Sequence, residues 1–387
     1  MKSKGFHLVW LTILLVILIG CAPKSVPVTA PTKAAPSPLS TLTSNISPLT
    51  SQSPTSQDIA WQKIIDAAKK EGKVNAYSFN WVGDIGIAVS KAFKEKYGIT
   101  LEVVTGRGAE FVERIKTEKR MGQIVGDVTE GSSLHTHNMR LEGLLTSVVD
   151  DVPVFREKNV WYVDVTAIDP QYKANLVWRI LEYAPYINTK LVKPEDVPQY
   201  WKDLLDPKWK GKMSLTEPNI SAGPYENIVV LMENKVWDEE YVKALYRQNL
   251  RYPLGLPDET LALARGDTHL IVRGTDASTG RYALEGAPIQ AIDMKDGMVV
   301  STASIGIVAN GPNPNATRVF INWIFGPEGI SVAGKLLGNK MVRKDVPDFR
   351  PKAVQANITR PFVESIEQLD KATKLYREKW FDKTVGR

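Results

Sequence analysis

One short loop of the chain has residues suited to binding an anion. In Thr-Gly-Arg-Gly-Ala-Glu, residues 105–110, Arg107 stands between Gly106 and Gly108. A guanidinium forms paired hydrogen bonds with a carboxylate or a phosphate, and glycine lets the backbone approach a ligand closely. The loop therefore predicts that Arg107 and Gly108 contact an anionic group. A solvated arginine at a tight turn is the alternative interpretation.

Two further loops carry hydroxyl and amide groups. The segment TEGSSLH at 129–135 contains Ser132 and Ser133, and EPNISAGP at 217–224 contains Asn219 and Ser221. These four side chains are candidate donors to a solute. A serine just before a helix commonly caps that helix instead, so each serine has a structural alternative.

The motifs of nucleophilic and metal-dependent enzymes are absent. The sequence has four histidines and contains neither Gly-x-Ser-x-Gly nor His-Glu-x-x-His. His135 and His137 would face different sides of a helix, so we interpret them as polar residues at a helix start. The segment GISVAGKL at 329–336 is close to a phosphate-binding loop, but Leu336 replaces the required Ser or Thr. We expect no enzymatic activity, no cofactor and no metal site.

The only cysteine of the chain, Cys21, has a distinctive setting. A positively charged start is followed by an apolar run over 6–19, and Leu18-Ile19-Gly20-Cys21 resembles a bacterial lipobox. The run is shorter than the roughly 20 residues of a membrane span and is typical of a signal peptide. The resemblance implies cleavage after residues 1–20 and a lipid anchor on Cys21, at the outer side of a cell membrane. The alternative is an uncleaved amino-terminal helix.

The segment after Cys21 has the composition of a spacer. Residues 22–57 are mostly Pro, Ser, Thr and Ala, without an acidic or aromatic residue. Such a stretch buries too little apolar surface to offset its chain entropy. We therefore predict that residues 21–57 form a disordered tether.

The composition of the rest indicates a well-packed protein without disulfides. The chain of 387 residues is 43% hydrophobic, has ten tryptophans and carries a net charge of +6. Its basic residues are scattered and form no block, which argues against nucleic acid as a partner. Residues 58–387 suffice for one large or two medium domains.

Alternating apolar patterns predict α/β structure in the first part of this body. Helices are expected at 58–71, 84–97 and 109–122, and strands at 73–79, 100–106 and 126–132. Gly72 and Gly98 stop the first two helices. This order predicts a parallel sheet covered by helices, with ligands at the carboxyl ends of the strands.

A second α/β unit follows, with a late segment that could return to the first. We expect strands at 174–189, 212–218 and 268–274, a helix and turn at 197–212, helices at 223–234, 238–249 and 259–267, a strand pair at 297–311, and two helices at 314–337.

Several phrases together resemble one family. IDAAKKEGKVNAYS, PYINTKLVKPEDVPQYWKDLLDPKWKGKMSLTEP, TASIGIVANGPNPNATRVFINWIFGPEGI and YREKWFDK are similar to the type II extracellular solute-binding proteins of ABC importers. The branch with ferric-iron, thiamine and aminoethylphosphonate binders is the most similar. The resemblance spans nearly all of 58–387 and rests on the order and spacing of the phrases.

The resemblance implies an α/β fold of two lobes, each a mainly parallel sheet flanked by helices, joined by a hinge with the ligand in the cleft. Residues 58–165 and 297–345 would form lobe 1, and 166–296 and 346–387 lobe 2. In such a fold Ser78 and Phe79, at the end of the first strand, would form a wall of the site.

The resemblance also bears on the ligand. Ferric-binding relatives use an adjacent tyrosine pair, whereas the matching stretch here, 272–289, holds Asp276 and a single Tyr282. This difference argues against iron. Asp276 would face a cationic group of the ligand or merely turn the chain. With Arg107 and Asp276 both in the cleft, a small ligand with an acid and an amine would fit.

We therefore expect a monomeric solute-binding protein with three kinds of partner: a small anionic or zwitterionic solute or a metal chelate, the permease and ATPase of an ABC importer, and the membrane through lipidated Cys21. The alternatives are a sensor that presents its ligand to a receptor, and a secreted carboxylate-dependent enzyme on the same fold.

Overall fold

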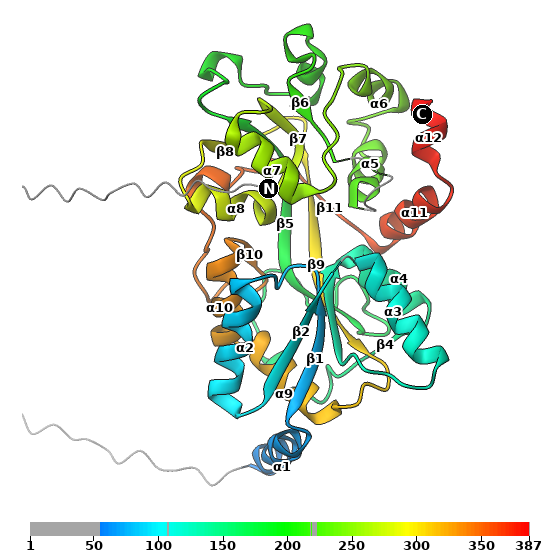
Figure 1. The fold of residues 1–387 in the computed structure, drawn as a ribbon, viewed down its shortest axis with the longest axis vertical. Helices are drawn as coiled ribbons and strands as arrows, with labels where there is room; N and C mark the ends of the chain where they lie inside the picture. Colours follow the sequence, from blue (N-terminus) through cyan, green and yellow to red (C-terminus); the bar gives the residue numbers. More distant parts are fainter. Residues whose placement is uncertain (1–54, 107, 217, 219–222, 387) are drawn as a thin grey trace, which may run out of the picture. The chain divides into compact units, whose positions relative to one another are not determined.

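Helices and strands alternate along the chain and form two halves, which lie below and above the middle of Figure 1. The computed structural model describes residues 55–106, 108–216, 218 and 223–386. Cys21 and the predicted tether therefore lie outside the described residues. Within the described residues, no helix combines the length and apolar character needed to cross a membrane.

The lower half contains the first elements of the chain and three that return to it. They are α1 (Ser56–Glu71), β1 (Lys73–Ser78), α2 (Asp84–Tyr97), β2 (Thr100–Thr105), α3 (Gly108–Arg120), β3 (Val128–Ser132), α4 (Ser133–Leu141), β4 (Leu145–Thr146), η1 (Pro153–Arg156), α9 (Pro314–Ile324), α10 (Pro327–Leu337) and β10 (Lys340–Met341).

The upper half contains the middle of the chain and its carboxyl-terminal segment. Its elements are η2 (Pro194–Asp196), η3 (Trp201–Leu205), η4 (Pro207–Trp209), β6 (Met213–Ser214), α5 (Gly223–Glu233), α6 (Glu239–Tyr246), α7 (Leu256–Arg265), β7 (Leu270–Thr275), α8 (Asp276–Leu284), β8 (Ile289–Ala291), η5 (Lys352–Val354), β11 (Pro361–Val363), α11 (Ile366–Arg377) and α12 (Trp380–Val385).

Local sequence signals define the first helices. Thr55 and Asp58 form a reciprocal capping box at the start of α1. Gly72 and Gly98 end α1 and α2 in the left-handed conformation, with φ of 75° and 73°, which glycine adopts without steric cost. The predicted positions of these two helix ends are confirmed.

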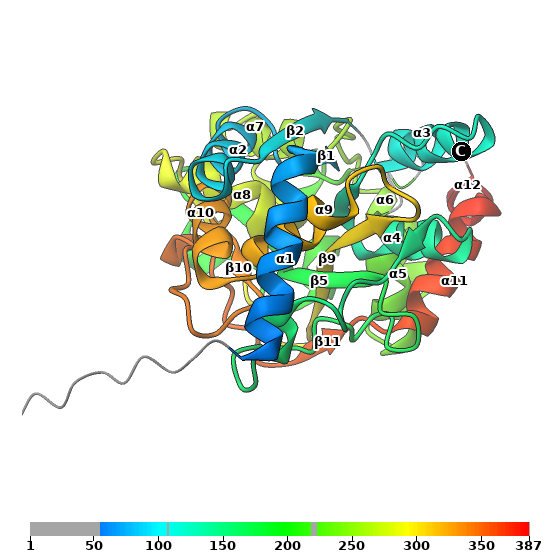
Figure 2. The ribbon, with the colours of Figure 1, turned by 90° about the horizontal axis from the view of Figure 1, so that it is seen from below.

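The predicted parallel sheet is present in the lower half. β1 pairs in parallel with β2, from Lys73 opposite Thr100 to Ser78 opposite Thr105, and also with β3. Figure 2 shows helices on both sides of the strands, with α2 and α10 on one side and α3 and α4 on the other. The carboxyl ends of β1, β2 and β3 consequently lie at one edge.

Two long strands, β5 (Asn175–Asn188) and β9 (Met298–Val308), connect the halves. They are antiparallel to each other, from Asn175 opposite Gly306 to Tyr183 opposite Val299. One end of β9 pairs with β3 and β4 and its other end with β11, while β5 pairs with β10 at one end and with β7 and β8 at the other. A single sheet, β2-β1-β3-β9-β5-β7-β6, therefore runs through both halves.

Several of the expected elements differ in the structure. The strand expected at 212–218 is limited to the two residues of β6. The strand pair expected at 297–311 is one continuous strand, because Ser301 and Ser304 do not interrupt it: their hydroxyls bond with Glu364 and Ser133 inside the protein. The helix expected within 197–212 is replaced by the short 3-10 turns η3 and η4. Pro207, which cannot continue a helix from the preceding turn, separates the two.

The core of the lower half is rich in aromatic rings. Trp81 packs edge-on against Trp178 of β5 and Phe320 of α9, with ring centroids 5.8 and 5.7 Å apart. These contacts join the segment after β1 to the long strand and to the returning helix. The end of β1 is thereby held against β5, and the site described below lies at this junction. The boundaries proposed for the two lobes stay a prediction.

Candidate functional site

A cavity of about 560 Å³ is lined by residues of both halves. This volume is typical of a site for a small molecule. The lower half contributes Phe79, Asn80, Gly108, Ala109, Glu110, Ser132 and His135. The two long strands contribute Arg179, Leu181, Tyr183 and Ala303. The upper half contributes Thr216, Leu254–Asp258, Arg273, Thr275, Ala277 and Tyr376.

Four helices begin at this cavity. α3 starts at Gly108, α4 follows its N-cap Ser132, α7 follows Gly255 and α8 follows its N-cap Thr275. The first turn of a helix has unpaired N–H groups and the positive end of the helix dipole. The cavity is therefore surrounded by partial positive charge from both halves, which favours an anionic ligand.

The floor of the cavity comes from the sheet. Arg179, Leu181 and Tyr183 alternate along β5, so their side chains project from one face. Ala303 of β9 lies opposite Arg179, and Thr275 of β7 lies opposite Tyr183. The floor thus has an arginine at one end, an apolar middle and an aromatic ring near the second arginine, Arg273.

The first arginine belongs to a buried polar network. Arg179 is 1% exposed, and its Nη2 donates to Glu130 Oε1 at 3.1 Å. Glu130 also accepts from the Ser78 hydroxyl at 2.7 Å and from the backbone and side-chain nitrogens of Asn80 at 3.1 and 2.8 Å. Asn339 accepts from Nη1 of Arg179. The charge of Arg179 is therefore largely matched by Glu130.

The second arginine is less constrained. Arg273 of β7 is 4% exposed, and its guanidinium lies over the Tyr183 ring, 4.3 Å from the centroid. Its Nε has no hydrogen-bond partner among the described residues. A buried donor without a partner costs free energy unless a solute or water satisfies it. The Nε of Arg179 also has no hydrogen-bond partner among the described residues, so it is the ion pair between Arg179 and Glu130 that leaves Arg273 as the better candidate to receive an anionic group.

Three buried carboxyl groups surround Arg273. Burial raises the pKa of Glu226 to about 7 and that of Glu259 to about 7, although the charge of Arg273 opposes both shifts. Burial and repulsion from Glu226 raise the pKa of Glu364 well above its usual value. Ser301 donates to Glu364 and Thr216 to Glu259, each at 2.8 Å. These groups hold protons close to neutral pH.

Gly108 and His135 meet at the lower wall. A Cβ on Gly108 would lie 2.7 Å from the imidazole ring, so glycine is required for α3 to approach α4 this closely. His135 Nδ1 bonds with the Ser132 hydroxyl at 2.8 Å. Burial lowers the pKa of His135 to about 4, so its ring is neutral at pH 7 and adds no charge to the cavity.

Of the residues predicted for the site, Phe79, Gly108 and Ser132 line the cavity together. Ser78 and Ser133 lie behind it and are fully buried. The Ser78 hydroxyl bonds with Glu130, and the Ser133 hydroxyl bonds with Thr302 and Ser304. Arg107, Asn219 and Ser221 lie outside the described residues.

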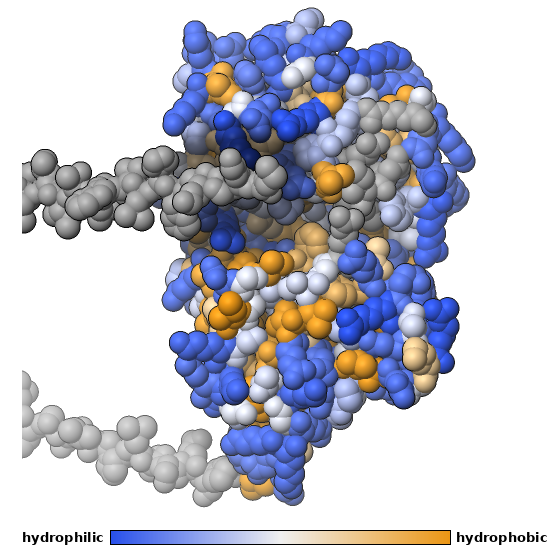
Figure 3. All heavy atoms as spheres, viewed as in Figure 1, coloured by the Kyte–Doolittle hydropathy of each residue, from blue (hydrophilic) through white to orange (hydrophobic). Residues whose placement is uncertain are grey.

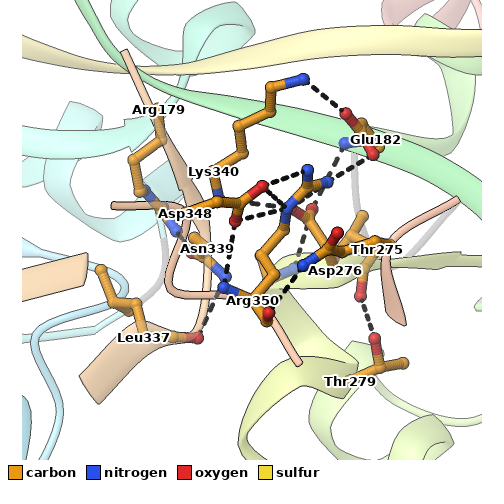
Figure 4. Close-up of polar contacts among 12 residues, drawn as sticks. Arg179, Glu182, Thr275, Asp276, Thr279, Leu337, Asn339, Lys340, Asp348 and Arg350 are labelled. Carbon is orange, nitrogen blue, oxygen red and sulfur yellow. Dashed lines mark hydrogen bonds and ion pairs between the residues drawn. The ribbon is translucent and has the colours of Figure 1, made fainter. Parts of the chain in front are cut away.

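Asp276 and Tyr282 are not part of the lining. Figure 4 shows Asp276 beside Arg350, whose Nη1 lies 3.7 Å from Asp276 Oδ2. Arg350 and Lys340 also pair with Glu182 of β5. Asp276 therefore joins α8 to β5 and to the chain beyond β10, at the junction of the halves. Tyr282 packs against the hydrophobic core.

Sequence reasoning missed the two floor arginines and the buried carboxyl groups. The available signal was a charged residue inside a mostly apolar strand: Arg179 in NLVWRILEY, which also contains Glu182, and Arg273 in LIVRGT. Arginine is rarely fully buried unless it has a partner. Glu226, Glu259 and Glu364 give no comparable signal, because glutamate is ordinary in exposed helices and loops.

Other surface features are weaker candidates. Figure 3 shows apolar side chains gathered on the lower half near its border with the upper half. Phe79, Val82, Ile87 and Val104, from the segment after β1, from α2 and from β2, are among the exposed hydrophobic residues. A hollow of about 660 Å³ along α3 is lined by residues 110–125 only, from one helix and the chain after it. Among the described residues, no group of three or more His, Cys, Asp or Glu side chains is arranged to hold a metal ion.

Comparison with known proteins gives one family. Residues 88–361 match the family model described as "Bacterial extracellular solute-binding protein". An uncharacterised protein of Haemophilus influenzae is 25% identical over 263 residues, which are 64% of this chain and 71% of that protein.

Solved structures share the fold. The periplasmic binding protein AfuA of Actinobacillus pleuropneumoniae, bound to fructose-6-phosphate, has a TM-score of 0.65 at 19% identity, over 80% of this chain and 98% of its own. Iron-bound HitA of Pseudomonas aeruginosa has a TM-score of 0.64 at 16% identity, over 79% and 98%. Trichodesmium FutA, with iron and citrate, has a TM-score of 0.63 at 18% identity, over 81% and 99%. The two-lobed α/β fold of periplasmic binding proteins is therefore confirmed.

The buried carboxyl groups predict that stability falls as pH rises from about 4.5 to about 7. Unfolded glutamates titrate near 4.5, whereas Glu226 and Glu259 titrate at about 7 in the folded protein. The folded state therefore binds extra protons, and this stabilisation is lost as pH rises through about 7. His135 acts oppositely, but only below its usual value of 6.5.

Between about pH 6.5 and pH 8 we expect the free energy of unfolding to fall by about 1 kcal/mol for each of these carboxyl groups. Urea denaturation at both pH values measures it. Glu226→Gln should reduce the difference, whereas Glu233→Gln, on the exposed side of the same helix, should not. Stability that is constant or rises over this interval would show that the carboxyl groups are already ionised.

Proposed function

The chain belongs to the family of bacterial extracellular solute-binding proteins, and we propose that it captures a small anionic or zwitterionic solute in the cavity between its halves. The family and its structural relatives are solute-binding proteins that act outside the cytoplasm. Delivery of the solute to the permease of an ABC importer is the second part of the proposal.

One observation carries the choice of ligand: two buried arginines and the amino-terminal ends of four helices line one cavity. The helix ends and Arg273 favour negative charge, whereas the charge of Arg179 is largely matched by Glu130. Leu181, Leu254 and Phe79 add apolar and aromatic surface, which suits the carbon skeleton of an organic anion. A bare metal ion fits less well, because the lining has one histidine and two carboxylates, Glu110 and Asp258.

The proteins of similar structure were solved with different ligands, so a panel of solutes is needed. AfuA was solved with fructose-6-phosphate and FutA with iron and citrate. We would test hexose phosphates, phosphonates, amino acids, citrate with and without ferric iron, polyamines and vitamins by thermal shift. A solute at 100 times its dissociation constant stabilises the protein by about 2.7 kcal/mol, which is readily measured.

Filling the cavity should abolish binding. Ala277 lies in the first turn of α8 and lines the cavity, so the indole of Ala277→Trp would occupy space meant for the solute. We expect the affinity for any solute that stabilises the wild type to fall at least tenfold, about 1.4 kcal/mol.

Leu284→Trp is the matched control, because Leu284 ends the same helix and is 56% exposed. It should bind as the wild type does. Equal affinity of both variants, measured by titration calorimetry, would place the solute elsewhere on the protein.

We also propose that the halves close on the solute, with the crossing strands β5 and β9 as the hinge. The lobes would comprise residues 58–165 with 297–345, and residues 166–296 with 346–387. The radius of gyration from small-angle scattering should decrease when a solute from the panel saturates the protein. An unchanged radius with a bound solute would contradict closure.

The last part of the proposal concerns location. Leu18-Ile19-Gly20-Cys21 resembles a lipobox, and a lipid on Cys21 would keep the protein at the outer side of a membrane. Cys21→Ser should release the protein from the membrane fraction of cells, and the wild type should incorporate labelled fatty acid. Membrane retention of the variant with an uncut amino terminus would contradict the anchor.

A further inference from the structure

Arg273 lines the cavity and interacts electrostatically with three buried glutamates: Glu226 of α5, Glu259 of α7 and Glu364 after β11. Thr216, which also lines the cavity, donates a hydrogen bond to Glu259 at 2.8 Å. The exposed fractions of these three glutamates are 1%, 0% and 5%. Both carboxyl oxygens of Glu226, one oxygen of Glu364 and one of Glu259 have no hydrogen-bond partner among the described residues.

The protonation of the three carboxyl groups determines the net charge that a solute encounters near Arg273. With all three carboxyl groups ionised, the single positive charge of Arg273 would be outweighed, and an anion would be repelled. When these groups are protonated, they no longer offset the positive charge of Arg273, which can then attract an anion in the cavity. Arg179 differs from Arg273 because Glu130 lies 3.1 Å from its guanidinium and forms an ion pair with it.

We propose that Arg273 receives the anionic group of the solute and that the cluster of Glu226, Glu259 and Glu364 takes up a proton when it does, so that an anion binds more tightly as pH falls. This inference rests on the proposed function and specifies how its binding site is regulated.

The physical reason is that the bound anion and the three carboxylates interact with the same guanidinium. Arg273 lowers the pKa of each of the three carboxyl groups. An anion that accepts hydrogen bonds from Arg273 weakens this stabilisation and adds a negative charge nearby, so the pKa of the carboxyl groups rises further. Near neutral pH a proton then moves from the solvent to a carboxylate oxygen. By linkage, a lower pH must strengthen anion binding.

The other charged and titratable groups around the cluster do not change this direction. Burial raises the pKa of Tyr183, whose ring packs on Arg273, so the phenol stays neutral. Ser301 of β9 and Thr216 donate hydrogen bonds to the cluster and do not titrate. Asp258 of α7 and Tyr376 of α11 lie on the open side, in the cavity lining.

Sulfate is a suitable probe because its charge is constant over the pH range of interest. We expect sulfate to bind with a millimolar dissociation constant at about pH 6 and roughly tenfold more weakly at about pH 8, which corresponds to a shift of about one unit in the pKa of one carboxyl group. Titration calorimetry at about pH 7, in two buffers with different ionisation enthalpies, should show net proton uptake.

Nearly isosteric variants separate the parts of the proposal. Glu226→Gln/Glu364→Gln imitates the protonated cluster, so sulfate should bind it with little pH dependence and little proton uptake. Glu233→Gln, on the exposed end of the same α5, should behave as the wild type. Arg273→Met should lose sulfate binding at both pH values while it retains its melting temperature within a few degrees.

The outcomes are decisive. Equal affinity for sulfate at the two pH values, proton release instead of uptake, or no sulfate binding at pH 6 would each overturn the inference. If Arg273→Met does not fold, the double glutamine variant alone decides. The proposed function is tested separately. It is wrong if no solute of the panel binds the wild type. It stands, without this inference, if a solute binds with an affinity that is insensitive to pH and to the glutamine substitutions.

Discussion

The antiparallel pairing of β5 with β9 is the constraint on which the rest of the structure depends. Both strands are longer than the others and are almost entirely buried, and each pairs with strands of the lower half at one end and of the upper half at the other. The halves therefore share a sheet. Because the face of β5 alternates Arg179, Leu181 and Tyr183 toward the cavity, the same strand that joins the halves also forms the floor between them.

Burial makes the electrostatics of this floor unusual. An arginine or a carboxylate taken out of water loses several kcal/mol of hydration unless partners replace it. Arg179 and Glu130 compensate each other at 3.1 Å. Arg350 compensates Asp276 only in part, because burial still raises the pKa of Asp276 to about 7. Arg273 and its three glutamates are compensated incompletely, since several of their polar atoms have no partner among the described residues. We propose that such a group responds to a bound charge, whereas the ion pair of Arg179 with Glu130 holds β5 to β3.

Much of the fold was predictable from local patterns. Gly72 and Gly98 end helices where the sequence places them, and the alternation of helices and strands over the first part of the chain predicted the parallel order of β1, β2 and β3. The site was predictable only in part. Phe79, Gly108 and Ser132 line the cavity because each lies where a strand meets a helix, which is a local property. Ser78 and Ser133 occupy equivalent positions in the sequence, but their hydroxyls point to buried partners.

The sequence by itself determined the class of the protein: an α/β body, a lipobox-like start and the phrases of a solute-binding family. These features depend on short-range periodicity, turn residues and motif order, which can be recognised in the amino-acid sequence alone. Only the tertiary structure decided that Arg273 interacts with Glu226, Glu259 and Glu364, that Gly108 must be small because of His135, and that residues 298–308 form one strand through both halves. The charge, pKa and space at a residue depend on neighbours distant in sequence, and the packing of the sheet brings those neighbours together.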